Sequence, residues 1–255
     1  MAKVKILTAA EAANLVEDGM TVSTNGFVAC DLPEELTSAL EKRFLETGSP
    51  KNLTYFYAAG QGNRDDHFAH EGMTSTVIAG HYNMAPKLGE LIMQNKIKAY
   101  NLPQGTLSQL YRDIAAKKLG TLTHVGLYTF ADPRVEGGKL NDITTEDLVE
   151  VVNICGEERL LYKAIHVDVA LIRATYADEY GNITMEHECC TAEATAIAQA
   201  AKNCGGKVIV QVEKVVTDVD PKLVKVPGIY VDAVVVTENK ENHTQCIGCE
   251  YDGSM

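Results

Sequence analysis

The sequence contains no tryptophan, only seven prolines, and few aromatic residues, which make up 6% of its 255 positions. No run of about 18 apolar residues occurs, so we expect no membrane span, and the N-terminus lacks the pattern of a signal peptide. Acidic residues outnumber basic ones by 35 to 23, the formal charge is -12, and neither sign forms a block. We therefore expect neither nucleic acid nor an anionic membrane as a partner.

The composition is that of a globular protein, with 45% apolar and 23% charged residues. A chain of this length buries a substantial core without disulfides or metals. We find no internal repeat, no low-complexity tract and no linker. The sequence therefore predicts one domain over residues 1–255.

The cysteines are odd in number and scattered, unlike the framework of a small secreted protein. We interpret them as reduced thiols and expect a cytoplasmic location. They are Cys30, Cys155, Cys189, Cys190, Cys204, Cys246 and Cys249.

Strand-like and helix-like segments alternate along the first half of the chain and again near its end. Because parallel strands need crossover helices, this alternation predicts an open, mostly parallel α/β sheet with helices on both faces. Predicted helices cover a segment from Thr8 to Gly19, then residues 33–48, 86–95, 106–118 and 191–204. Predicted strands cover 20–24, 52–58, 76–79, 97–102, 167–175, 208–212 and 229–236.

Residues of about 120–165 have a different texture, with short strand-like pieces separated by Gly, Pro, Asn and Asp. One such piece is Val149 to Ile154. The segment predicts a β-rich inserted layer.

Several common catalytic motifs are missing. The chain has no phosphate-binding G-x-x-x-x-G-K-[ST] and no G-x-S-x-G, and the stretch Gly60 to Asp65 lacks the third glycine of a dinucleotide fingerprint. Nucleotide and serine hydrolase chemistry are therefore disfavoured. Gln61 and Asn63 in that stretch are still able to reach a ligand, although a plain strand-exit loop explains it equally well.

Metal motifs are also incomplete. His67 and His70 lack the H-E-x-x-H spacing, and Cys246 to Cys249 is half of a zinc-ribbon pattern. The other half is missing because Cys189 and Cys190 are adjacent. We expect no metal site, although a redox pair stays open.

Two further loops follow predicted strands. Asn25-Gly26-Phe27 and Leu102-Pro103-Gln104-Gly105 each contain a glycine that lets a backbone N–H approach a ligand closely. The Gln104 amide is a candidate donor to a developing oxyanion. Either loop is equally explained as a tight turn.

Many short motifs, taken in order, carry a family resemblance that covers nearly the whole chain. They are Thr24-Asn25-Gly26-Phe27, Leu32-Pro33-Glu34, Glu41-Lys42-Arg43-Phe44, Gln61-Gly62-Asn63-Arg64, His67 to Gly72, Asn141-Asp142-Ile143-Thr144, Ala170 to Arg173, Ala177-Asp178, Gly181 to Thr184 and Val226 to Asp232. Together they resemble the family I CoA-transferases, and within them the propionate (acyl-CoA:acetate or lactate) CoA-transferases.

The resemblance implies a ping-pong exchange of CoA between carboxylic acids. A glutamate carboxylate attacks the acyl-CoA thioester, and a glutamyl-CoA thioester forms as the intermediate. Acyl-CoA and a short-chain carboxylate are the implied substrates. The resemblance implies no metal and no prosthetic group, with coenzyme A acting as a substrate.

Single-chain members of this subfamily are about twice as long, and their nucleophilic glutamate lies in the second half. The resemblance therefore implies that this chain is an amino-terminal half or α subunit whose partner half or β subunit supplies the glutamate. Glu-x-Gly triplets occur at Glu17, Glu46, Glu136 and Glu179, at helix ends and turns, and none is expected to be the nucleophile. We expect an apolar face and oligomerisation.

The implied contribution of this half is the wall of an acyl pocket. Its candidate residues are Gly26, Phe27, Gln61, Gly62, Asn63 and Gly105, with Gln104 stabilising the thioester oxygen. Substituents near Val28 to Asp31 and at Asn83-Met84 depart from relatives, which puts the acyl specificity in doubt. The alternatives are a non-catalytic acyl-CoA-binding or assembly module and a hydrolase that releases the acyl group to water.

Overall fold

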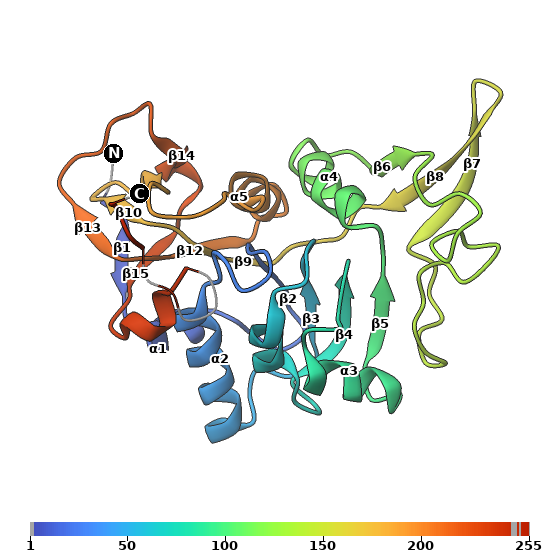
Figure 1. Ribbon diagram of the computed structural model, residues 1–255, viewed down its shortest axis with the longest axis horizontal. Coiled ribbons are helices and arrows are strands. Elements are labelled where there is room, and N and C mark those ends of the chain that lie inside the picture. The colour runs from blue at the N-terminus through green and yellow to red at the C-terminus, as the bar shows by residue number, and fades with distance from the viewer. Residues whose placement is uncertain (1–2, 246–248, 250, 255) are drawn as a thin grey trace.

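The computed structural model describes residues 3–245, 249 and 251–254. Its centre is an eight-stranded sheet (Figure 1) with the order β1-β15-β12-β9-β2-β3-β4-β5. These strands are β1 (Lys5–Leu7), β2 (Thr21–Thr24), β3 (Leu53–Phe56), β4 (Thr74–Ala79), β5 (Lys98–Asn101), β9 (Val169–Arg173), β12 (Lys207–Val212) and β15 (Ala233–Val236).

Every neighbouring pair in this sheet is parallel, which confirms the predicted architecture. Inner strands such as β9 and β12 are rich in apolar, often β-branched residues because both of their faces are covered, whereas β2 buries the polar residues Ser23 and Thr24. In β9, for example, all five residues from Val169 to Arg173 are buried.

Helices cover both faces of the sheet, as predicted (Figure 1). They are α1 (Ala9–Ala13), α2 (Glu34–Thr47), α3 (Pro86–Met93), α4 (Gln104–Ala115) and α5 (Ala194–Asn203), with short 3-10 helices η1 (Gly62–Phe68), η2 (Gly228–Tyr230) and η3 (Lys240–His243). Apolar residues of α1, α2, α3 and η1 form one core with one face, and those of α4 and α5 form a second core with the other. Within the described residues, no helix combines the length and apolar character that crossing a bilayer requires.

The predicted β-rich insertion is an antiparallel sheet with the order β6-β8-β7. Its strands are β6 (Gly120–Thr123), β7 (Val149–Ile154) and β8 (Glu157–Lys163), and the connection between β6 and β7 consists mainly of turns. Figure 1 shows it extending away from the main sheet beyond α4 and β5. We call residues 119–163 the arm.

A second small sheet, not anticipated from the sequence, has the order β13-β10-β11-β14. Its strands are β10 (Tyr176–Asp178), β11 (Ile183–Thr184), β13 (Lys214–Val216) and β14 (Val224–Val226). The turn predicted between positions 178 and 182 connects β10 to β11, whose pairing is antiparallel. Strands of two or three residues carry too little periodicity to be detected from sequence.

Two element boundaries differ most from the sequence expectation. Helix α1 ends at Ala13 instead of continuing to Gly19, and the three residues of β1 precede it. The last predicted strand begins at Ala233, because residues Gly228–Tyr230 form a 3-10 turn. The capping box at the start of α1 is present, with Thr8 and Glu11 bonded reciprocally.

Candidate active site

The strand order reverses direction between β2 and β9, which pair with each other at the middle of the sheet. In open α/β sheets, ligands bind outside the carboxyl ends of the strands at such a switch point. Asn25, directly after β2, spans this point: its side chain donates to Arg173 O (3.2 Å) and accepts from Arg173 N (2.8 Å). The candidate site is therefore built from the loops that follow β2, β3, β4 and β5.

The first of these loops, residues 25–31, has unusual backbone geometry. Val28, Ala29 and Asp31 all have positive φ angles (47°, 65° and 57°), which are rare in non-glycine residues and rarest in a β-branched one. Phe27 N and Cys30 N each donate to the carbonyl of the other residue. Strain of this kind persists where the surrounding structure imposes it, and it concentrates at functional sites.

Gln61 holds this loop against the next one. Its Oε1 accepts from Thr24 Oγ1 (2.9 Å) and Tyr55 OH (3.2 Å), so its amide is engaged inside the protein. Asp65, which the sequence analysis missed, accepts from Gln61 N (3.1 Å) and Tyr55 OH (3.0 Å). Burial raises the pKa of Asp65 to about 7. The only sequence signal for Asp65 was an acidic residue four positions after Gln61 in the same predicted loop.

The predicted loop of residues 102–105 leads into helix α4, and Gln104 is the first residue of that helix. It lies beside Gly80, where an added Cβ would be 2.9 Å from Gln104 Cβ and 2.6 Å from Ala58 O. The loops after β3, β4 and β5 therefore meet at this point. The N-cap is Pro103, which provides no capping side chain, so the first N–H groups of α4 face outward with the positive end of the helix dipole.

The structure brings some predicted residues together and leaves others apart. Gly26 touches Gln61, because an added Cβ would be 3.3 Å from the Gln61 side chain, and Gly62 is similarly placed 3.6 Å from Ala29. Phe27 and Asn63 are exposed at the same edge. Gly105 instead lines a separate hollow of about 270 Å³ between α4 and β6.

A buried charged cluster beside the first loop was not anticipated. Arg173 Nε pairs with Glu188 Oε2 at 3.0 Å, and the side chains of these residues are 2% and 0% exposed. His243 Nε2 lies 3.6 Å from Glu188 Oε1. The only sequence signal was an arginine at the end of an apolar strand, because the other members lie far away along the chain.

Asp31 completes this cluster. Its side chain is buried and accepts from Cys190 Sγ, while Cys189 Sγ lies 3.7 Å from its other oxygen. Burial raises the pKa of Asp31 to about 7, and the adjacent Glu188 carboxylate acts in the same direction. Burial also opposes ionisation of Glu188, but His243 and Arg173 outweigh it and hold the pKa of that carboxyl below its ordinary value.

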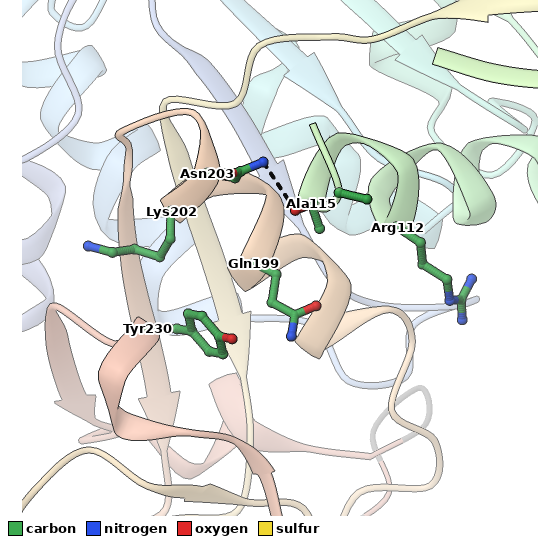
Figure 2. A pocket seen from close by; sticks show the side chains of 7 residues that line it. Arg112, Ala115, Gln199, Lys202, Asn203 and Tyr230 are labelled. Carbon is green, nitrogen blue, oxygen red and sulfur yellow. Dashed lines mark hydrogen bonds between the residues drawn. The ribbon is translucent and has the colours of Figure 1, made fainter. Parts of the chain in front are cut away.

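Two hollows lie at different places relative to the carboxyl edge of the sheet. A groove of about 890 Å³ is bordered by Gly80, Asn83 and Asn101, at the carboxyl ends of β4 and β5. The pocket in Figure 2, about 450 Å³, lies between the C-terminal ends of α4 and α5, at the opposite edge. There Lys202 and Arg112 point in different directions (Figure 2), and Lys202 pairs with Asp232 at 2.8 Å. Of these two hollows, the groove is the one that adjoins the candidate site.

Comparisons with known proteins agree with this arrangement. Residues 6–237 match the coenzyme A transferase family. Caffeate CoA-transferase of Acetobacterium woodii is 45% identical over 254 residues, covering 97% of this chain and 48% of that protein. Acetate CoA-transferase subunit alpha of Escherichia coli K12 is 28% identical over 242 residues, covering 94% of this chain and 100% of that subunit.

Among solved structures, a thioester complex with CoA of the acyl-CoA transferase YdiF from Escherichia coli O157:H7 superimposes with a TM-score of 0.90. It is 41% identical, and the match covers 92% of this chain and 50% of that one. The chain thus spans about half the length of caffeate CoA-transferase and of YdiF. Because the family match extends over most of the sequence, the chain belongs to the coenzyme A transferase family.

Proposed function

We propose that this chain is the amino-terminal half or α subunit of a short-chain acyl-CoA:carboxylate CoA-transferase. Acetate and propionate are the proposed acids, and the proposed location is the cytoplasm. A second half or β subunit supplies the nucleophilic glutamate. The acetate CoA-transferase subunit alpha, to which this chain is similar, is named as one subunit of a CoA-transferase. This supports the division into two polypeptides.

The proposed reaction proceeds by ping-pong acyl exchange. The glutamate oxygen attacks the thioester carbon, the C–S bond breaks, and CoA leaves as a thiolate while a mixed anhydride forms. The thiolate then attacks the glutamyl carbonyl, giving glutamyl-CoA and releasing the first acid. An acceptor carboxylate reverses these two steps. Because carboxylates and thiolates exchange acyl groups unaided, we propose that no metal or prosthetic group takes part, with CoA serving as a substrate.

The observation that carries the partner requirement is the state of the acidic groups near the strand ends. Five acids near this edge are buried and bonded internally. Asp31, Asp65 and the Glu188 side chain are 0–1% exposed, and Glu34 and Asp66 are 6% and 8% exposed. A nucleophile must reach a thioester carbon directly.

The Glu-x-Gly triplets do not lie at this edge either. Glu17 precedes β2 and Glu46 ends α2, so both lie at the amino edge of the sheet, while Glu136 is on the arm and Glu179 follows β10. The distribution of acids in the described residues therefore favours a glutamate from a second polypeptide.

Gln104 supports the proposed role in oxyanion stabilisation through its position. It is exposed at the start of α4, beside a groove of the size that binds small ligands. Uncapped N–H groups and the helix dipole act at the same point. Negative charge that develops on a thioester oxygen is stabilised by such fixed donors.

The arm supports a partner. Nine of its large apolar residues are exposed, half of the eighteen found among the described residues, and exposed apolar surface of this extent marks protein contacts. They are Leu119, Leu122, Val125, Tyr128, Phe130, Val135, Leu140, Ile143 and Ile154.

The test is reconstitution. The chain is mixed with a candidate second polypeptide of the family and with acyl-CoA, and the mixture is examined for a glutamyl-CoA thioester that hydroxylamine or borohydride destroys. We expect the thioester only in the mixture, on the second polypeptide. Thioester formation by this chain alone would overturn the partner requirement.

Two outcomes would replace the proposal. Calorimetric CoA binding without exchange of labelled acetate, whatever second polypeptide of the family is added, would identify a non-catalytic binding module. Release of the acyl group to water without transfer would identify a hydrolase.

A further inference from the structure

Two groups of potential metal ligands adjoin the buried cluster beside the first loop. One consists of Asp31, Cys189 and Cys190, and the other of Glu188, Glu213 and His243; in each group the ligand atoms lie within 4.8 Å of one another. The two groups adjoin through Asp31 and Glu188. The two groups differ in how well their ligand atoms are able to bind a cation.

In the group of Glu188, Glu213 and His243, the histidine ring already takes part in a hydrogen bond. Gln211 Oε1 accepts from Glu35 N (2.9 Å) and its Nε2 donates to Asn242 O (2.8 Å), which fixes the orientation of the amide. That Nε2 also lies 3.0 Å from His243 Nδ1, so Nδ1 is the acceptor and the proton of the neutral ring sits on Nε2. Because a ligating nitrogen needs a lone pair, this ring is not a metal ligand.

In the other group, the ligand atoms of Asp31, Cys189 and Cys190 lie close together. Cys189 Sγ is 3.7 Å from Asp31 Oδ1, and Cys190 Sγ contacts Asp31 Oδ2. Ligands of tetrahedral zinc, bound at about 2.0–2.3 Å, are separated from one another by about 3.3–3.8 Å. Cys189 Sγ therefore lies at ligand separation from Asp31 Oδ1, and the closer contact of Cys190 Sγ with Oδ2 reaches this separation by a small side-chain rotation.

The Asp31 carboxyl group accepts hydrogen bonds from the thiols of Cys189 and Cys190. The buried Glu188 carboxylate beside it is paired with the Arg173 guanidinium and lies 3.6 Å from His243 Nε2. Thiols are weak hydrogen-bond donors, so they compensate a buried carboxylate poorly. A divalent cation that displaces the two thiol protons leaves the net charge of the site unchanged and replaces two weak hydrogen bonds to the carboxylate with a metal–carboxylate bond.

We propose that Asp31, Cys189 and Cys190 form a binding site for a thiophilic divalent cation such as Zn²⁺. Binding displaces one proton from each thiol to solvent, and water completes the four-coordinate ion. The site joins the strained loop 25–31 to the segment before α5. It differs from the sequence expectation of no metal, which rested on cysteine spacing alone.

The experiment titrates the reduced, chelator-treated chain with Cd²⁺, whose thiolate complexes have an ultraviolet charge-transfer band, and measures Zn²⁺ affinity by competition with a chromophoric chelator. We expect one equivalent to bind and the Tm to rise with Zn²⁺, because a ligand held only by the folded state stabilises it. Cys190→Ser and Asp31→Asn should each weaken binding at least about tenfold.

Two choices make the result decisive. Asn tolerates the positive φ of position 31, so Asp31→Asn removes a ligand and preserves the backbone. Cys155→Ser, at an exposed cysteine in the turn between β7 and β8, is the control and should bind like the unmodified chain. Absence of the band at one equivalent, or equal affinity in Cys190→Ser, Asp31→Asn and the control, would refute the site.

Discussion

Gly80 and Gly89 are two glycines whose surroundings are opposite. A Cβ at Gly80 would lie 2.6 Å from Ala58 O, whereas one at Gly89, inside helix α3, meets nothing within 4 Å. We predict that Gly80→Ala lowers the free energy of unfolding by about 1–3 kcal/mol, because backbone and Gln104 must shift. Gly89→Ala should instead raise it by about 1 kcal/mol through helix propensity. Urea unfolding of both variants measures this, and a Gly80→Ala protein as stable as the unmodified chain would contradict the packing described.

Gln104 is the residue on which the proposed chemistry of this half depends. In the reconstituted enzyme we predict that Gln104→Ala lowers kcat about 100-fold, the usual cost of losing one oxyanion donor. Gln109, another exposed glutamine of α4, provides the control, since Gln109→Ala should leave kcat nearly unchanged. Steady-state kinetics of the two variants separates the cases, and equal rates would remove Gln104 from the reaction.

At the scale of elements, helix α2 and the 3-10 helix η1 are joined by a chain of charged groups. His67 contacts Glu41 and lies 2.8 Å from Glu34 Oε1, and His70 Nε2 lies 2.6 Å from Glu41 Oε1. Burial alone would lower the pKa of His67, but the two carboxylates outweigh it and raise the pKa above 6.5. Burial likewise opposes ionisation of Glu41, and the two histidines outweigh it and lower its pKa below 4.5.

These shifts define a pH window. A raised histidine pKa stabilises the fold fully below 6.5, and this contribution is lost as pH rises through the folded-state value. A lowered glutamate pKa stabilises the fold above pH 4.5, and this contribution is lost as pH falls through the folded-state pKa. We predict that the difference in stability between the unmodified chain and His67→Asn is largest between pH 4.5 and 6.5 and shrinks above it. Urea midpoints at three pH values measure this difference, and one that is constant with pH would show that the cluster is not coupled to folding.

At the scale of the whole molecule, exposed apolar area is concentrated on the arm. Leu119 and Leu122 are 85% and 45% exposed on or next to β6. We predict that the isolated chain self-associates through this surface and that the double variant Leu119→Ser, Leu122→Ser reduces the association. Met93→Ser, at an equally exposed position on α3, is the control. Light scattering after size-exclusion chromatography measures the mass, and a purely monomeric unmodified chain of 27.7 kDa would contradict the prediction.

The alternation of strand and helix predicted the parallel sheet and its two helical faces, because buried parallel strands are mostly apolar and need helical crossovers. The glycines and amides after strands also marked the loops at the carboxyl edge. The sequence could not distinguish Gln61, engaged inside the protein, from Gln104, exposed at a helix start, since this depends on Thr24 and Tyr55.

The sequence by itself thus determined the architecture and the family, because hydrophobic periodicity and short motifs are local along the chain. Only the tertiary structure joined Asp31 to Cys190 and Arg173 to Glu188, and decided which acids are buried. The reason is physical: periodicity reports which face of an element is buried, whereas the pairing of polar groups depends on strand order, which brings together residues separated by more than 150 positions.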